Sequence, residues 1–187
     1  MDTSTSTSTD GTEDFLPQGF RRIGELRFRE TVGAGLADFR TGMVIEHRPR
    51  RTVTELDHAM TLALTGNPAP VHSDAEYCRT VGPGRPLVCG IVSLGIVIGL
   101  TVRATSGLTS ANLALDGMRF TAPVFVGDTL SATTEVVEAR RSSSRPEHGI
   151  VTCRITGHNQ DGVQVLTAKR TFFVPAEAQV VRDATGY

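Results

Sequence analysis

Hydrophobic residues follow two different spacings along the chain. In the first half they recur every three to four positions, over residues 56–64 and through the nearly continuous apolar run PLVCGIVSLGIVIGLTV at 86–102, as is typical of helices. Apolar and polar positions then alternate from 111 to 175, which predicts four strands, with NQDG at 159–162 as a hairpin turn. Helices followed by consecutive strands predict an α+β domain in which an antiparallel sheet encloses the apolar helix.

Short signals mark where the first elements begin and end. Residues 43–53 alternate apolar and charged positions, and Pro49 places such a strand at the edge of a sheet rather than in its centre. Thr54 is a suitable N-cap, and Asp57 lies three positions later in the arrangement of a capping box. The helix that starts there is expected to end at Gly66, because glycine readily adopts the left-handed conformation that closes a helix.

The apolar run at 86–102 approaches the roughly 18–20 residues that a membrane span requires. It contains Ser93 and Thr101, however, and Arg85 and Arg103 bracket it. A helix that is apolar on every face also suits the interior of a water-soluble protein. Because the rest of the chain is amphipathic and predicts a sheet able to enclose this helix, we expect a buried core helix and no membrane partner.

Composition divides the chain into four parts. Residues 1–14 are rich in Ser, Thr and Asp and are expected to be a disordered tail. Residues 15–37 mix Arg, Gly and isolated hydrophobic residues, and we interpret them as an N-terminal arm. The length of 187 residues suits one folded domain, which we place at 38–176, followed by a C-terminal tail at 177–187.

Charge and cysteine content exclude several classes of function. The formal net charge is −1 and the isoelectric point is near 6.5, so no general attraction to nucleic acid is expected. Cys78, Cys89 and Cys153 are too scattered for a disulfide framework, and no C-x-x-C pair suggests zinc. The opening residues lack the basic and apolar regions of a secretory signal. We therefore expect a cytoplasmic protein without a metal site.

Several segments resemble one family when they are taken together. They are TGNPAPVHSDAEYCRT, GRPLVCGIVSLG, LDGMRFTAPVFVGDTL and GIVTCRITGHNQDG followed by RTFFVP. In this combination, over about residues 38–175, the chain resembles the MaoC-like hydratases and dehydratases of acyl thioesters. The resemblance implies a hot-dog fold, in which an antiparallel sheet wraps around one long helix. It also implies an acyl-CoA or acyl-carrier thioester as substrate, no cofactor apart from the CoA of that substrate, and a homodimer or a higher homo-oligomer.

The resemblance assigns the loop after the first helix to the active site. In the (R)-specific enoyl-thioester hydratases of this family the loop is similar to S-G-D-x-N-P-x-H, where Asp and His together hold the water that is added. The histidine corresponds to His72, whereas the acid position is occupied by Asn67. The branch similar to mesaconyl-CoA hydratase has a loop resembling N-x-A-P-x-H, so a carboxamide there is compatible with activity.

Hydration of an enoyl thioester needs a base, an acid and donors for the enolate oxygen. Asn67 can orient water but cannot accept a proton, so His72 is the candidate base. The helix at 86–102 presents unsatisfied N–H groups at its start, where Gly90 would let a thioester carbonyl approach the backbone. The candidate residues for oxyanion and substrate binding are therefore Gly90 and its neighbours in sequence and loop, Cys89, Val88 and Pro70.

Three points stay open in the sequence. Arg85 and Arg103 flank the apolar helix and are candidates for contacts with CoA or with a substrate carboxylate. A hot-dog thioesterase is an alternative activity, in which Asp74 or Glu76 would supply the carboxylate that is missing at position 67. A further alternative is a non-catalytic partner subunit that binds acyl thioesters.

The remaining histidines show no ligand spacing and are interpreted as surface or structural residues: His47, His58, His148 and His158.

Overall fold

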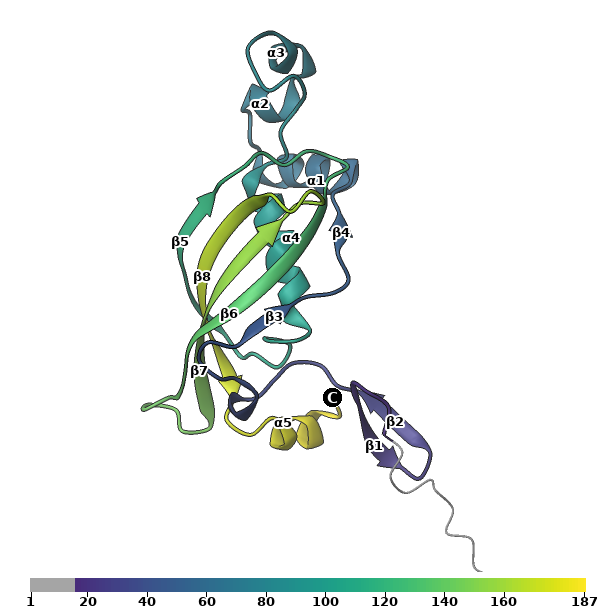
Figure 1. Ribbon diagram of the computed structural model, residues 1–187, viewed down its shortest axis with the longest axis vertical. Helices are drawn as coiled ribbons and strands as arrows, with labels where there is room; N and C mark the ends of the chain where they lie inside the picture. Colours follow the sequence, from purple (N-terminus) through teal and green to yellow (C-terminus); the bar gives the residue numbers. More distant parts are fainter. Residues whose placement is uncertain (1–15) are drawn as a thin grey trace, which may run out of the picture.

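One curved antiparallel sheet dominates the molecule. The computed structural model describes residues 16–187, so the tail expected at 1–14 lies outside the described residues. Figure 1 shows the sheet curving around helix α4 (Gly90–Val102). The strands follow in the order β3 (Val44–Glu46), β6 (Thr129–Arg141), β7 (His148–His158), β8 (Gln164–Pro175) and β5 (Asn112–Phe120), while β4 (Arg51–Thr52) also pairs with β6.

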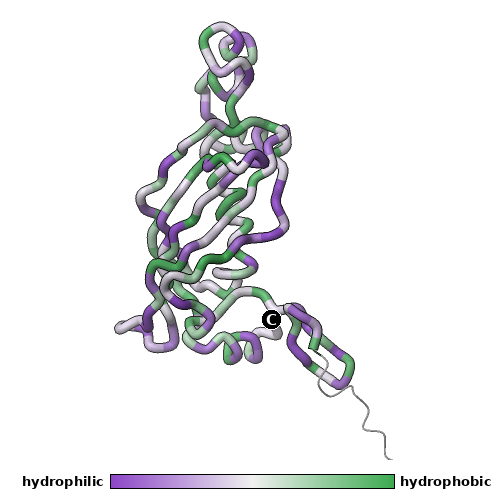
Figure 2. Tube along the Cα trace, viewed as in Figure 1, coloured by the Kyte–Doolittle hydropathy of each residue, from purple (hydrophilic) through white to green (hydrophobic). Residues whose placement is uncertain are grey.

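The main core lies between α4 and the concave face of the sheet. Figure 2 shows apolar residues along α4 and alternating character along the strands around it. Val97 of α4 is fully buried, and it lies so close to Gly157 of β7 that a Cβ at position 157 would be 2.6 Å from its Cγ2 atom. The helix therefore packs against bare backbone at this point. Apolar side chains of both layers complete the core, including Val92, Ile96, Leu130, Ala132, Ile155 and Leu166.

Three short helices cover one end of this core. Figure 1 shows α1 (Glu55–Thr65) at the end where α4 begins, with α2 (Pro70–Ser73) and α3 (Ala75–Thr80) projecting beyond it. Gly66 ends α1 in the left-handed conformation, with a φ of 60°. Helix α4 begins at Gly90 and not at the start of the apolar run, because the preceding residues pair with other segments. Among these pairs, the Leu87 N–H donates to the Val71 carbonyl.

The first described segment and the last helix lie at the opposite end of the sheet. The N-terminal segment forms a hairpin of β1 (Phe20–Gly24) and β2 (Arg27–Glu30), followed by a short 3₁₀ helix, η1 (Leu36–Asp38). Near the C-terminus, α5 (Ala178–Thr185) lies against this region (Figure 1). A hydrogen bond of 2.8 Å from Arg182 to the Gly33 carbonyl links the two ends.

The structure confirms the α+β class, the four long strands and both ends of α1. The strand expected at 43–53 is an edge strand, but it is interrupted, because β3 and β4 pair with β6 as two separate pieces. Within residues 16–187, no helix combines the length and the hydropathy that a membrane crossing requires.

The capping box of α1 makes a testable contribution to stability. The Thr54 hydroxyl accepts a hydrogen bond from the Asp57 N–H, and the Asp57 carboxylate accepts one from the Thr54 N–H at 2.9 Å. Thr54→Ala is expected to lower the free energy of unfolding by about 1 kcal/mol at neutral pH, as measured by urea denaturation. On the same helix, Thr61→Ala should change it by less than about 0.5 kcal/mol.

The effect of the Thr54 substitution should depend on pH. Hydrogen bonding to the Thr54 backbone, together with further contacts of Thr54 and Arg51, holds the pKa of Asp57 below its ordinary value of 3.8. A lowered pKa in the folded state stabilises the fold above the ordinary pKa, and this contribution is lost as the pH falls through the folded value. Thr54→Ala keeps the backbone bond but loses the bond of 2.8 Å that the Thr54 hydroxyl donates to the Asp57 carboxylate. The difference between wild type and Thr54→Ala should therefore shrink in acid, where this carboxylate is protonated, and an equal difference at all pH values would contradict this account.

Candidate active site

The loop between α1 and α2 is held by its own backbone contacts. The Asn67 side-chain oxygen accepts a hydrogen bond of 3.0 Å from the Ala69 N–H, which forms a tight turn directly after Gly66. Pro70 then occupies the first position of α2, where its fixed φ suits a helix start. The loop consequently presents His72 from a short and rigid segment.

His72 is oriented by the segment that leads into α4. Its Nδ1 atom lies 2.9 Å from the Leu87 carbonyl oxygen. Because a carbonyl can only accept, Nδ1 must carry the proton of this bond, and in the neutral ring Nε2 then holds the free lone pair. This tautomer is the one in which Nε2 can take a proton from water.

A second histidine lies beside the first. His58, from the first turns of α1, is buried, and its Nε2 atom donates to the His72 carbonyl oxygen at 2.7 Å. The two rings are 6.4 Å apart between centroids and are inclined at 70°. The Nδ1 atom of His58 is buried without a hydrogen-bond partner among residues 16–187. The sequence predicts only a surface or structural role for His58, because no spacing signal links two histidines that lie on separate helices, α1 and α2.

His72 lines a pocket of about 390 Å³ between α1, α2 and the segment before α4. Arg85 also lines it, with its guanidinium carbon 4.1 Å from the centroid of the Phe125 ring. The pocket therefore brings together the imidazole of His72, the guanidinium of Arg85 and the carboxylate of Glu55. Its other lining residues are His58, Ala59, Leu62, Ser73, Pro86 and Val126.

The start of α4 lies next to Asn67. The Asn67 amide nitrogen donates to the sulfur of Cys89, the N-cap residue, at 3.8 Å. Gly90 packs directly against Phe120 of β5, so that a Cβ there would be 2.6 Å from the ring. Among residues 16–187, no backbone acceptor is found for the Gly90 N–H. The Val88 N–H, in contrast, donates to the Val124 carbonyl, so Val88 cannot serve as an oxyanion donor through this group.

The structure brings some of the candidate residues together and separates others. Asn67, Pro70 and His72 all lie at the end of the molecule where α4 begins, and residues 87–89 connect them to that helix. Arg103 lies at the opposite end of α4 and forms an ion pair with Glu30 of the N-terminal hairpin. Arg103 is therefore not part of this site.

The carboxylates considered for a thioesterase have other partners. Asp74 caps α3, where its side chain accepts a hydrogen bond of 2.9 Å from the Tyr77 N–H. Glu76 is exposed and forms an ion pair with Arg79. Neither residue lines the His72 pocket.

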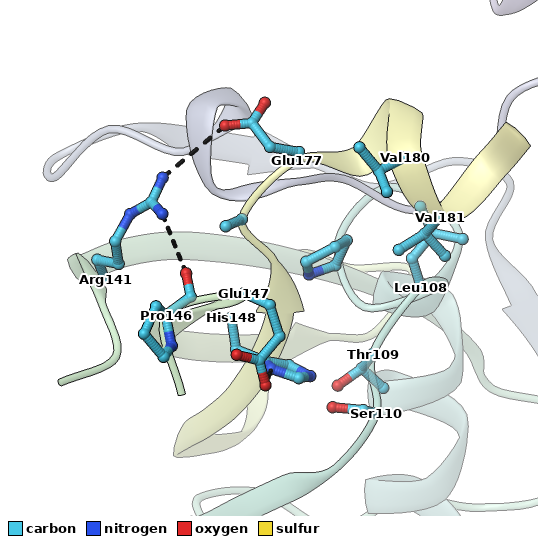
Figure 3. Close-up of a pocket in the computed structure, with 12 residues that line it drawn as sticks. Leu108, Thr109, Ser110, Arg141, Pro146, Glu147, His148, Glu177, Val180 and Val181 are labelled. Atoms are coloured by element: carbon cyan, nitrogen blue, oxygen red, sulfur yellow. Dashed lines mark hydrogen bonds and ion pairs between the residues drawn. The ribbon is translucent and has the colours of Figure 1, made fainter. Parts of the chain in front are cut away.

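A separate pocket of about 460 Å³ lies at the far end of the sheet, beside α5 (Figure 3). Figure 3 shows Arg141 at its rim, joined to Glu177 and to the Pro146 carbonyl, with the side chains of Val180 and Val181 opposite. It contains none of the candidate residues. Within the described part of the chain, no three side chains of the usual ligand types gather as a metal site would require.

Comparison with known proteins assigns the chain to a family. The family model of the MaoC like domain matches residues 38–159. The chain belongs to the MaoC-like family. The match includes both the loop with His72 and the start of α4, and it ends within the turn between β7 and β8.

Two curated relatives of this MaoC-like protein act on CoA thioesters by name. The β-methylmalyl-CoA dehydratase of Chloroflexus aurantiacus is 35% identical over 153 residues, which cover 78% of this chain and 43% of the relative. The mesaconyl-CoA hydratase of Cereibacter sphaeroides is 32% identical over 165 residues, which cover 84% and 48%. The chain therefore spans less than half the length of these relatives.

A solved structure confirms the hot-dog fold. A conserved protein of Mycobacterium tuberculosis, described as having a double hot-dog fold, superimposes with a TM-score of 0.70 and 29% identity. The superposition covers 78% of this chain and 45% of the other. The MaoC-like chain thus corresponds to about half of a double hot-dog protein.

The contact between Gly90 and Phe120 predicts how the start of α4 tolerates substitution. Gly90→Ala should lower the free energy of unfolding by about 1–3 kcal/mol, because the added methyl group displaces the Phe120 ring. Gly95, on the same helix, has open space where its Cβ would be. Gly95→Ala should leave the stability unchanged or raise it, since alanine favours helix. Equal losses in both variants, measured by urea denaturation, would show that Phe120 does not decide the outcome.

Proposed function

We propose that this MaoC-like chain is a hydratase or dehydratase, which adds or removes water across the α,β double bond of a short acyl-CoA thioester. The observation that carries the proposal is the orientation of His72, whose Nδ1 atom is occupied by the Leu87 carbonyl beside a pocket. A histidine held in this way keeps one nitrogen for proton transfer. An acyl thioester of a carrier protein would undergo the same reaction, with the carrier protein in place of CoA.

His72 acts as the base in the direction of hydration. Its Nε2 atom takes a proton from water, and the resulting hydroxide equivalent adds to the β-carbon. Negative charge then develops on the thioester oxygen, and the protonated His72 ring gives its proton to the α-carbon, which completes the addition of water and restores the neutral imidazole. In dehydration the same steps run backwards, and His72 returns the proton to the departing hydroxyl.

The Gly90 N–H at the start of α4 stabilises the developing oxyanion. It carries the positive end of the helix dipole, and the neighbouring Val88 N–H is already occupied. Asn67 keeps one amide hydrogen and one oxygen lone pair beyond its contacts with Ala69 and Cys89, so it is able to orient water. Arg85 lies in the His72 pocket and is a candidate contact for a CoA phosphate.

His72→Ala is the direct test of this mechanism. It should lower kcat for hydration of crotonyl-CoA or mesaconyl-CoA by about 10²–10⁴-fold, the usual contribution of a general base. The loss of the enoyl absorbance measures the rate. His158→Ala, at the end of β7, is the matched control and should retain wild-type activity. Full activity in His72→Ala would end the assignment of His72 as the base.

The same assay separates the alternative functions. Release of free thiol from a saturated acyl-CoA without loss of enoyl absorbance would indicate a thioesterase. Binding of acyl-CoA without any turnover would indicate a non-catalytic subunit.

Asn67→Asp restores the carboxylate found in the (R)-specific loop pattern and should retain activity or raise it.

We further propose that two copies of the chain form a homodimer. The chain matches about half of a double hot-dog protein, and β5 forms an open sheet edge. Large apolar side chains are exposed on β5 and at the start of α4, which in a monomer would face water. These residues are Ile91, Leu113, Leu115, Met118 and Phe120.

Sedimentation velocity tests the dimer. Met118 is 43% exposed on β5, and Met118→Lys should shift the protein towards monomer, because a lysine would be buried between the copies. Val163→Lys, at the β7–β8 turn, changes a side chain that is exposed to a similar extent (47%) and should leave the dimer intact. A monomeric wild-type protein would contradict this proposal.

A further inference from the structure

The two faces of the sheet differ in whether their charged side chains have partners of opposite charge. Across the outer face, the register places Glu135 beside Arg154, Arg154 beside Lys169, and Lys169 beside Asp116. Each basic residue in this row therefore has a carboxylate as a neighbour on the next strand. Glu135 and Arg154 also form an ion pair. Charges on this face are compensated and exposed to water.

The next row, on the inner face, contains an isolated cation. Successive residues of a strand point to opposite faces, so Arg170 points inward where Lys169 points outward. Its neighbours in register are Cys153 on β7 and Leu115 on β5. Arg170 is only 4% exposed, and none of the ion pairs found among residues 16–187 includes it.

Only some of the hydrogen-bond donors of the Arg170 guanidinium have acceptors. The Nε atom donates to the Asn112 side-chain oxygen at 2.7 Å, and the group lies 4.8 Å from the centroid of the Phe172 ring. Its Nη1 atom is buried and has no acceptor among residues 16–187. Burial lowers the pKa of Arg170 and raises that of the Cys153 thiol to about 12, so the thiol provides no negative charge.

Arg170 lines a pocket of about 280 Å³ between α4 and β5. Ile98 contributes from α4, and Leu113 and Leu115 contribute from β5, so the walls are largely apolar. An arginine that is buried and incompletely paired binds a carboxylate strongly, because two parallel hydrogen bonds form in a site with little water. Apolar walls ending at a guanidinium suit an aliphatic chain with a terminal carboxylate better than a hydrated phosphate.

The pocket lies between α4 and β5, the same two elements that meet at Gly90. Phe120 of β5 packs on Gly90, and Leu115 lies five residues earlier on that strand. Ile98 lies eight residues after Gly90 on α4, which is about 12 Å along the helix axis. An acyl group whose thioester oxygen is bound at Gly90 would therefore extend between α4 and β5 to reach Arg170.

We propose that Arg170 binds the terminal carboxylate of a dicarboxylic acyl-CoA substrate, so that the enzyme selects acyl chains that carry a second acid group. This inference rests on the proposed function, because it places the thioester at the start of α4. Mesaconyl and β-methylmalyl groups, which name the substrates of the two curated relatives, each carry a second carboxylate.

Binding of saturated acyl-CoA thioesters tests the inference without requiring catalysis. Isothermal titration compares succinyl-, glutaryl- and adipyl-CoA with butyryl-, valeryl- and hexanoyl-CoA. Wild-type protein should prefer the dicarboxylic member of at least one pair of equal length. In Arg170→Met this preference should fall about ten- to hundredfold, because a charge-assisted pair is lost. Lys169→Met, from the next position on β8 but the opposite face, should preserve the preference.

Two further measurements exclude a merely structural role. Arg170→Lys keeps the charge but loses the forked donor arrangement, so it should give an intermediate preference. Sedimentation velocity of each variant shows whether Arg170 instead pairs with a carboxylate of a second copy. Dissociation of the dimer in Arg170→Met, or equal weakening of both acyl series, would overturn the inference.

The outcomes for the two proposals are distinguishable. Wild-type protein that binds both series without preference would overturn the role of Arg170 and leave the hydratase proposal standing. Binding that prefers dicarboxylic chains, with no turnover of mesaconyl-CoA, would support Arg170 and refute the hydratase. Failure to bind either series would overturn both.

Discussion

The structure depends on the burial of an almost wholly apolar helix against the concave face of one sheet. Val97 packs against bare backbone at Gly157, so α4 and β7 approach more closely than side chains would otherwise allow. This contact fixes the position of α4 along the sheet. The first turn of α4 lies at the end covered by α1 (Figure 1), and the Gly90 N–H there has no backbone acceptor among residues 16–187.

Hydrogen bonds attach the candidate active site to the segment that leads into this end of α4. The α1–α2 loop is attached to residues 87–89 through His72, Val71 and Asn67. The residues of the proposed chemistry therefore share one support, and the imidazole is held in a single tautomer by a main-chain carbonyl. His58 strengthens this arrangement from α1 by donating to the His72 backbone.

The inner face of the sheet has a second property beyond holding α4. Most of its residues are apolar, yet Arg170 lies among them beside the pocket between α4 and β5. A buried cation without a counter-charge is costly unless an anion arrives with a ligand. The proposed second copy would lie over β5 and enclose this pocket, so the proposed dimer and the proposed selection of the acyl chain involve the same strand.

The sequence by itself determined helix α1, the apolar helix, the four long strands and the family, but not the β1–β2 hairpin or α5. The change from helical to alternating spacing, the capping box at Thr54 and the glycine at position 66 are local signals, and each was confirmed. The motif around His72 located the loop but not its contacts. Only the tertiary structure decided that His58 lies beside His72, that Arg103 lies at the wrong end of α4, and that Arg170 faces inward without a carboxylate. These facts depend on strand register and on which segments meet across the core. The spacing of residues along one sequence determines neither of them.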